Sequence, residues 1–209
     1  AFPRRAFIVG PNAIGKSNLL LSFLFLRDLV LEGGGLASAV HQRGGMGKIR
    51  SLYARQDTEI VIRVTVQDDA GAGWRYELAF THDSVKRPRP VVCRELVERI
   101  HADGQTTELL RRPNLEDKQD TERLTQTAIQ QVTANQLFRD LANFFRSVSY
   151  LHLVPQVVRE EQTPKPDEVG PDPYGRGLLD QIRNTSRRTQ EARLKRINSV
   201  LGAVVPQLE

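Results

Sequence analysis

The chain of 209 residues has one cysteine and no run of eighteen apolar residues. Cys93 alone can form neither an internal disulfide nor a cysteine-rich metal site, and its apolar neighbours favour an inert core thiol. The most hydrophobic stretch, Asn18–Val30, is interrupted by a serine and two charged residues, so it is too polar to span a membrane. The N-terminal residues have no signal-peptide pattern. We therefore expect a soluble cytoplasmic protein.

The remaining composition is that of a globular chain with a basic balance. Hydrophobic residues make up 39% and charged residues 26%, which suits one α/β domain or two lobes of one. The net charge of +5 makes nucleic acid a plausible partner. A basic segment near the C-terminus is either a phosphate-binding helix face, or else an ordinary solvated face or the surface of a missing lobe, and the sequence does not decide between them. Its basic residues are Arg183, Arg187, Arg188, Arg193, Lys195 and Arg196.

The strongest motif is Gly-x4-Gly-Lys-Ser, which begins at Gly10. In such a loop the backbone N–H groups point at the phosphates of a nucleotide, and the following helix N-terminus adds a favourable partial charge. Lys16 is expected to neutralise phosphate oxygens, and the Ser17 hydroxyl to ligate Mg2+. The alternative is a glycine-rich turn without a ligand. The predicted nucleotide-binding residues are Gly10, Pro11, Asn12, Ala13, Ile14, Gly15, Lys16, Ser17 and Asn18.

The sequence around the loop supports this interpretation. Ala6–Val9 is a short apolar run typical of a buried parallel strand, and Asn18–Leu26 is typical of a helix that is apolar nearly all round. Gly33–Gly35 should end that helix, and a loop containing Arg43–Gly47 should follow. No Asn-Lys-x-Asp string for guanine is present, which favours ATP over GTP.

Further along the chain, hydrophobic periodicity predicts two antiparallel hairpins and then helical and extended segments. The expected elements are strands over 60–66 and 74–80, strands over 91–101 and 106–111, a helical stretch ending near Phe145, a core strand over 147–154, and helix from 177 onward. We predict a nucleotide-binding lobe over residues 1–159, a flexible connection over 160–176, and a helical segment over 177–209.

This arrangement resembles the N-terminal lobe of SMC/RecF-type ABC ATPases, and among them the OLD-family and Septu-type antiphage ATPases. The residues that carry the resemblance are Gly10–Asn18 and Tyr150–Arg159, the latter containing a Pro-Gln pair. It implies an α/β P-loop NTPase with an ABC/SMC-like head and an antiparallel β subdomain, of which this chain is the N-terminal part only.

The same resemblance identifies Gln156 as the glutamine that reaches Mg2+ and the attacking water. A neutral carboxamide suits that role, since its oxygen can ligate a hard cation and its NH2 group can orient water. The alternative is that Pro155-Gln156 only terminates a strand. His152 could point toward the same site, although a satisfied core or edge histidine is the more common case.

Two motifs that hydrolysis needs in this family are absent from the sequence. No strand of four apolar residues is followed by Asp-Glu, and the nearest candidate, Gly177–Gln181, has only two apolar residues before its carboxylate. No Leu-Ser-Gly-Gly-Gln-like signature is present. We therefore expect these groups to lie elsewhere, and this chain alone to bind nucleotide weakly and hydrolyse it barely.

The resemblance implies that two heads sandwich ATP head to tail, with ATP binding and hydrolysis coupled to DNA or to a nuclease effector in phage defence or genome maintenance. Two alternatives remain open. A kinase-type phosphotransferase would also use the loop, although the two hairpins fit it poorly. A nucleotide-dependent interaction module without hydrolysis would explain the absent Asp-Glu pair.

Overall fold

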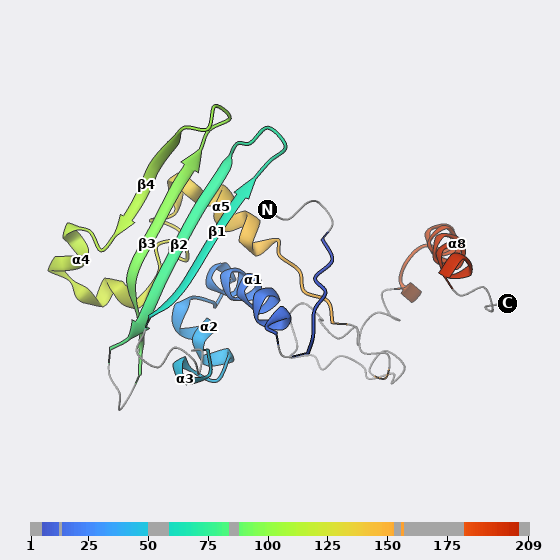
Figure 1. Cartoon of the computed structure of the whole chain (residues 1–209), viewed down its shortest axis with the longest axis horizontal. Coiled ribbons are helices and arrows are strands. Elements are labelled where there is room, and N and C mark those ends of the chain that lie inside the picture. Colours follow the sequence, from blue (N-terminus) through green and yellow to red (C-terminus); the bar gives the residue numbers. More distant parts are fainter. Residues whose placement is uncertain are drawn as a thin grey trace. The chain divides into compact units, whose positions relative to one another are not determined.

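The structure is a computed structural model that describes residues 6–12, 14–49, 59–83, 88–152, 156 and 182–204. The chain divides into two compact units, residues 1–148 and residues 149–209, and each is described by itself (Figure 1). The predicted domain boundaries near residues 159 and 176 lie outside the described residues.

Four strands form one antiparallel sheet in the order β1-β2-β3-β4 (Figure 1). Their bounds are Ile60–Gln67 for β1, Gly73–His82 for β2, Pro90–Ile100 for β3 and Thr106–Arg112 for β4. β1 pairs with β2 without a break, whereas register shifts interrupt the pairings β2–β3 and β3–β4. Both predicted hairpins are confirmed.

The turns β1–β2 and β3–β4 each contain an aspartate whose side chain accepts a backbone hydrogen bond and a glycine with positive φ. Asp68 accepts hydrogen bonds from the backbone N–H groups of Ala70 and Ala72, and Gly71 adopts a φ of 82°. Such a side chain satisfies backbone donors that the strands leave unpaired, and glycine adopts positive φ without steric cost. Local chemistry thus fixes this hairpin as the sequence pattern predicted.

Helices cover one face of the sheet and form the core with it (Figure 1). The ring of Phe25 stacks on that of Phe80 with centroids 5.3 Å apart, and Tyr76 meets Phe145 edge-on. The helical elements of unit 1 are α1 Lys16–Val30, α2 Leu36–Gln42, α3 Met46–Ile49, α4 Leu115–Gln119, η1 Thr121–Thr125, η2 Gln136–Phe138 and α5 Arg139–Arg146. The residues predicted as a loop around Arg43–Gly47 therefore lie between and within two short helices, α2 and α3.

The predictions of a buried strand over Ala6–Val9 and of a core strand over 147–154 are wrong for the described residues. Ala6–Val9 forms no strand, and Phe7 and Val9 are 92% and 91% exposed. Residues 147–152 are also non-strand, and 153–154 lie outside the described residues. A parallel strand is stable when neighbours pair with it on a sheet covered on both faces. The described residues provide no such neighbour for either segment.

The prediction of one helical stretch up to Phe145 is also wrong. Residues 127–135 form turns, and Val132 and Leu137 are both 70% exposed. Within the predicted stretch, only α5 is a regular α-helix. The physical reason is that side chains take the backbone groups a helix would need. Glu95 accepts hydrogen bonds from the N–H groups of Ala128 and Ile129, and Asn135 donates to the carbonyl of Ile129.

Glu95 belongs to a buried ionic network between the sheet and these turns. Arg112 at the end of β4 donates to Glu95 at 3.3 Å and to both carboxylate oxygens of Asp117, at 2.7 and 3.0 Å. It also donates to the carbonyls of Gln126 and Arg123. Such a network is tolerated in a core only when nearly every donor and acceptor is satisfied.

The surroundings of the two carboxyl groups shift their pKa values in opposite directions. Burial raises the pKa of Glu95, against the opposing effect of the N–H groups of Ala128 and Ile129. Burial also acts to raise the pKa of Asp117, but hydrogen bonds from Arg112 and Asn114 outweigh it and hold that pKa below its usual value. Asp117 is therefore the more acidic of the two carboxyl groups that contact Arg112.

We predict that removing Arg112 is much more damaging than removing its neighbour Arg111. Arg112→Ala leaves buried Glu95 and Asp117 without their cation, so the free energy of unfolding should fall by about 3–5 kcal/mol. Arg111→Ala removes only an exposed pair with Glu108, which should cost about 1 kcal/mol or less. Urea unfolding of both variants measures the difference, and equal losses would contradict the importance of the network.

Candidate functional site

The glycine-rich loop and the start of α1 form the candidate site. Gly15 is the residue before α1 and adopts a φ of 99°, a left-handed conformation that residues with a side chain rarely take. The Lys16 ammonium lies 2.7 Å from the carbonyl oxygens of both Gly10 and Pro11, so the lysine reaches back across its own loop. The loop therefore folds around a cation.

The first turn of α1 adds further attraction for an anion. It carries no acidic residue, and no side chain caps it. The N–H groups of a helix's first turn have no carbonyl partner inside the helix, and the aligned peptide dipoles place partial positive charge there. Ser17 and Asn18 lie in this first turn and are exposed. In the loop before it, Pro11, Asn12 and Ile14 are also exposed, and Ala13 lies outside the described residues.

The C-terminal half of α1 is fixed to the rest of unit 1. Asp28, which is buried, pairs with Arg43 at 2.8 Å and with Arg27 at 2.9 Å, and Arg43 also lies over the ring of Phe25. Arg146 of α5 donates twice to the carbonyl of Val30, the last residue of α1. These contacts fix the C-terminal half of α1, the helix whose N-terminal end follows the loop.

A sharp turn between α1 and α2 depends on glycine. A Cβ at Gly34 would lie 2.2 Å from the carbonyl oxygen of Asp28, closer than any side chain tolerates. Gly35 donates to that same carbonyl at 3.0 Å. The predicted end of the helix at Gly33–Gly35 is confirmed, and α2 folds back beside α1.

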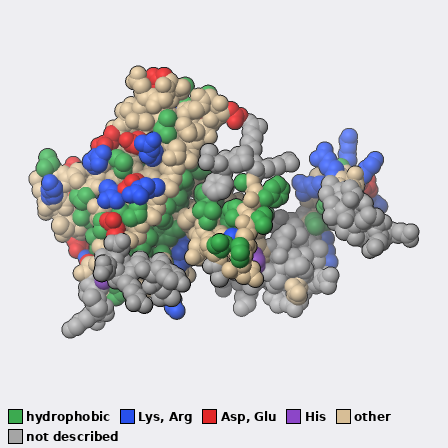
Figure 2. Space-filling view, in the orientation of Figure 1, with side chains coloured by type: hydrophobic (Ala, Val, Ile, Leu, Met, Phe, Trp, Pro, Cys, Tyr) green, Lys and Arg blue, Asp and Glu red, His purple; other side chains and the backbone are tan. Residues whose placement is uncertain are grey.

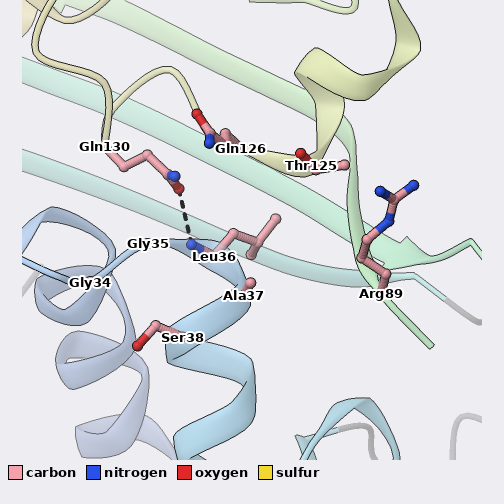
Figure 3. Close-up of a pocket in the computed structure, with 9 residues that line it drawn as sticks. All are labelled: Gly34, Gly35, Leu36, Ala37, Ser38, Arg89, Thr125, Gln126 and Gln130. Atoms are coloured by element: carbon pink, nitrogen blue, oxygen red, sulfur yellow. Dashed lines mark hydrogen bonds between the residues drawn. The ribbon is translucent and has the colours of Figure 1, made fainter. Parts of the chain in front are cut away.

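A pocket of about 280 Å3 lies between this turn and residues 125–130 (Figure 3). Gln130 points from the loop above to the turn below, and its Oε1 accepts a hydrogen bond from Leu36 N at 2.9 Å. Arg89 also lines the pocket, but it pairs with both Asp83 and Glu122, so its charge is balanced. The lining residues are Gly34, Gly35, Leu36, Ala37, Ser38, Arg89, Thr125, Gln126 and Gln130.

Sequence reasoning did not single out this pocket. Gln130 and Leu36 are 94 positions apart, and nothing in the local pattern around either residue indicates their contact. Because its arginine is already neutralised, the pocket offers an anion less than the loop around Lys16 does. The loop remains the better candidate for phosphate.

Gln156 and His152 belong to the second unit, residues 149–209. Gln156 is exposed. His152 is exposed rather than part of a core, and its ring stacks on that of Tyr150 with centroids 6.3 Å apart. The predicted role of Gln156 in metal binding stays a prediction.

Helix α8, Arg187–Val204, also belongs to the second unit (Figure 1). Basic side chains gather on it in the space-filling view (Figure 2). Arg187 pairs with Glu191 at 3.6 Å, the one acidic residue of the helix. Helix over this part of the predicted segment 177–209 is confirmed. Its exposed cations are Arg187, Arg188, Arg193, Lys195 and Arg196.

Other sites receive less support from the described residues. The described residues contain no group of three or more His, Cys, Asp or Glu side chains placed to hold a metal ion. Cys93 is half-buried on β3, and burial raises the pKa of its thiol, in keeping with the inert thiol predicted. None of the helices in the described ranges is long and apolar enough to cross a membrane.

Comparison with known proteins identifies the family. Residues 5–191 match the family described as "AAA domain, putative AbiEii toxin, Type IV TA system". Searches among curated proteins and among solved structures found no match. The match spans most of the chain and includes the whole loop from Gly10 to Ser17. The chain belongs to this family of AAA domains, whose members are P-loop nucleotide-binding ATPases.

Proposed function

We propose that the chain is the ATP-binding part of an SMC/RecF/OLD-like ATPase. The observation that carries the proposal is the Lys16 ammonium held inside a loop that leads into an uncapped helix N-terminus. A cation and a set of backbone N–H groups converging on one place match the charge and shape of a polyphosphate.

The residues present fit ATP and Mg2+. Lys16 would pair with phosphate oxygens, the N–H groups of the loop and of the first turn would donate to them, and the exposed Ser17 hydroxyl would be a metal ligand. Mg2+ would neutralise phosphate charge when bound. Gln156 would contribute a second oxygen ligand and orient water through its NH2 group. Gly15 is needed because the backbone turns there with positive φ.

Hydrolysis requires groups that residues 1–209 do not contain. The sequence has no apolar strand followed by Asp-Glu and no signature motif. We propose that these come from elsewhere in the complete protein, and that two heads associate head to tail around ATP. ATP binding would close this dimer, hydrolysis would reopen it, and the motion would regulate DNA or a nuclease effector in phage defence or genome maintenance.

A second function is favoured by the same missing carboxylates. Binding of ATP without hydrolysis could order a surface that recruits another protein. In that case ATP would bind to the same residues, but the complete protein would not hydrolyse it.

We further propose that α8 is where DNA binds. Five exposed cations and a single acidic residue give this helix a dense positive charge, which favours a phosphate backbone. An ordinary solvated helix would carry acidic residues between its cations, as the exposed sheet face does in its Arg–Glu pairs.

Substitution of Lys16 tests the nucleotide site directly. Lys16→Ala should weaken ATP binding at least about tenfold without unfolding the chain, because the lysine is half-exposed and makes no core contact. Isothermal titration measures the affinity, and thermal unfolding checks the fold. Lys48→Ala on α3 is the matched control, since it removes the same charge from an exposed position elsewhere. Unchanged ATP affinity in Lys16→Ala would refute the phosphate assignment.

Gln156→Ala distinguishes a catalytic glutamine from a binding residue. We expect ATP affinity to change less than about threefold, and ATP turnover by the complete protein to fall about tenfold or more, because a water-orienting group acts mainly in the reaction. Turnover is measured as released phosphate at saturating ATP. A loss of affinity as large as that of Lys16→Ala, with turnover at saturation intact, would show that the assignment is wrong.

Charge reversal on α8 tests the DNA proposal. The double substitution Arg188→Glu with Lys195→Glu should lower affinity for double-stranded DNA about tenfold and reduce its salt dependence. The control is Lys48→Glu with Lys118→Glu, which changes the net charge equally at exposed sites outside α8. Fluorescence anisotropy over a range of salt concentrations measures the DNA affinity of each variant and its salt dependence. Equal losses in the two double variants would assign the effect to net charge alone.

A further inference from the structure

The two edges of the sheet differ in how well they are protected from pairing with another strand. Among the described residues, β1 and β4 are the outer strands of the sheet, so each has one neighbouring strand there and one row of backbone groups on its other side. In native sheets such edges are usually blunted by charges, proline or bulges. The comparison of these two strands shows which edge is open to a partner.

β4 carries several protective features. A register shift interrupts its pairing with β3 at Val97/Glu98, and the strand is followed directly by Pro113, which has no N–H to donate. Three charged residues, Glu108, Arg111 and Arg112, lie along its seven positions. This edge is a poor template for another strand.

β1 carries almost none of these protective features. Its eight residues include no proline, glycine or lysine, and its register with β2 runs unbroken from Ile60 to Gln67. Its one charged residue, Arg63, is already paired with Glu77 at 2.6 Å. Among the described residues, only those of β2 form backbone hydrogen bonds with β1.

The inward side chains of β1 are also incompletely covered. On the neighbouring strand β2, Tyr76, Leu78 and Phe80 are fully buried, whereas Ile62 and Val64 of β1 face the same core and remain half-exposed. A further strand beside β1, with apolar residues on that face, would remove this apolar surface from water.

We propose that β1 pairs antiparallel with β1 of a second copy of this chain, so that the two sheets join into one. Residues directly opposite each other in antiparallel strands point to the same face, so the core sides coincide only when the paired residue numbers sum to an even value. Two such registers use nearly the full strand, one with Arg63 on the two-fold axis and one with Val64 there.

Charge selects the second register. With Arg63 on the axis, two guanidinium groups lie directly opposite each other, which is destabilising. With Val64 on the axis, Arg63 lies opposite Thr65 of the second copy, and Ile62 lies opposite its Val66. The apolar residues then continue the core across the junction, and no like charges meet.

This pairing also stops at two copies. Joining the two open edges leaves only the protected β4 edges on the outside of the combined sheet. The dimer is independent of the nucleotide-dependent association proposed above, because β1 lies apart in sequence from the phosphate-binding loop and pairs without ATP.

Cysteine crosslinking tests the register in a Cys93→Ser background. With Val64 on the axis, Val64→Cys places two thiols next to each other, so oxidation with copper phenanthroline should give a covalent dimer. Val66→Cys is the matched control, because its two copies would be roughly 13 Å apart along the strands, too far for a disulfide. Equal crosslinking of both variants, or crosslinking of neither, would overturn the proposal.

Oligomeric state provides the second test. Sedimentation velocity without nucleotide should show a dimer of the 23.6 kDa chain, and Thr65→Lys should raise its dissociation constant about tenfold, because it places two lysine–arginine pairs opposite each other. Thr106→Lys on β4 is the control and should leave the dissociation constant of the dimer unchanged. A monomer at about 100 μM, or equal effects of the two substitutions, would overturn the proposal.

The variants also separate this dimer from the one in the proposed function. Lys16→Ala should leave the β1 dimer intact while abolishing any association that requires ATP. If instead all association needs ATP and is lost in Lys16→Ala, the β1 pairing is refuted and the proposed function is not.

Discussion

The buried pairing of Glu95 with Arg112 is the interaction on which the rest of unit 1 depends. Four donors converge on the Glu95 carboxylate, and two of them are backbone N–H groups of Ala128 and Ile129. A carboxyl group that is fully buried needs hydrogen-bond partners of this kind, because leaving its oxygens unsatisfied would cost several kcal/mol. The requirement forces residues 126–130 into turns against the sheet rather than into a helix.

Those turns then determine the position of the nucleotide loop. They place Gln130 where its side chain bonds to Leu36 N at the start of α2, directly after the turn that ends α1. The Asp28–Arg43 ion pair and the bonds from Arg146 to Val30 fix the same end of α1. The opposite end of that helix bears Lys16 and remains exposed, so a fixed helix presents the proposed phosphate site to solvent.

Local features were well predicted because their causes are local. The glycine at position 15, the lysine after it and the helix that follows are written in adjacent residues, and so are the alternating strands around Asp68–Gly73. The segments Ala6–Val9 and 147–154 were predicted as strands from their apolar residues, and the described parts of both are not strands. A strand, however, needs a neighbour to pair with, and that condition is not local.

The sequence by itself determined that the chain is a P-loop ATPase domain, and it determined both hairpins, since a motif and a two-residue period specify the backbone of a short segment directly. Only the tertiary structure decided that residues 127–135 are not helical, that Arg112 rather than Arg111 is the buried cation, and that Gln130 contacts α2. The physical reason is that each of these depends on which distant group satisfies a buried polar atom. Neighbouring residues cannot specify that partner, because the folded chain brings it from many positions away.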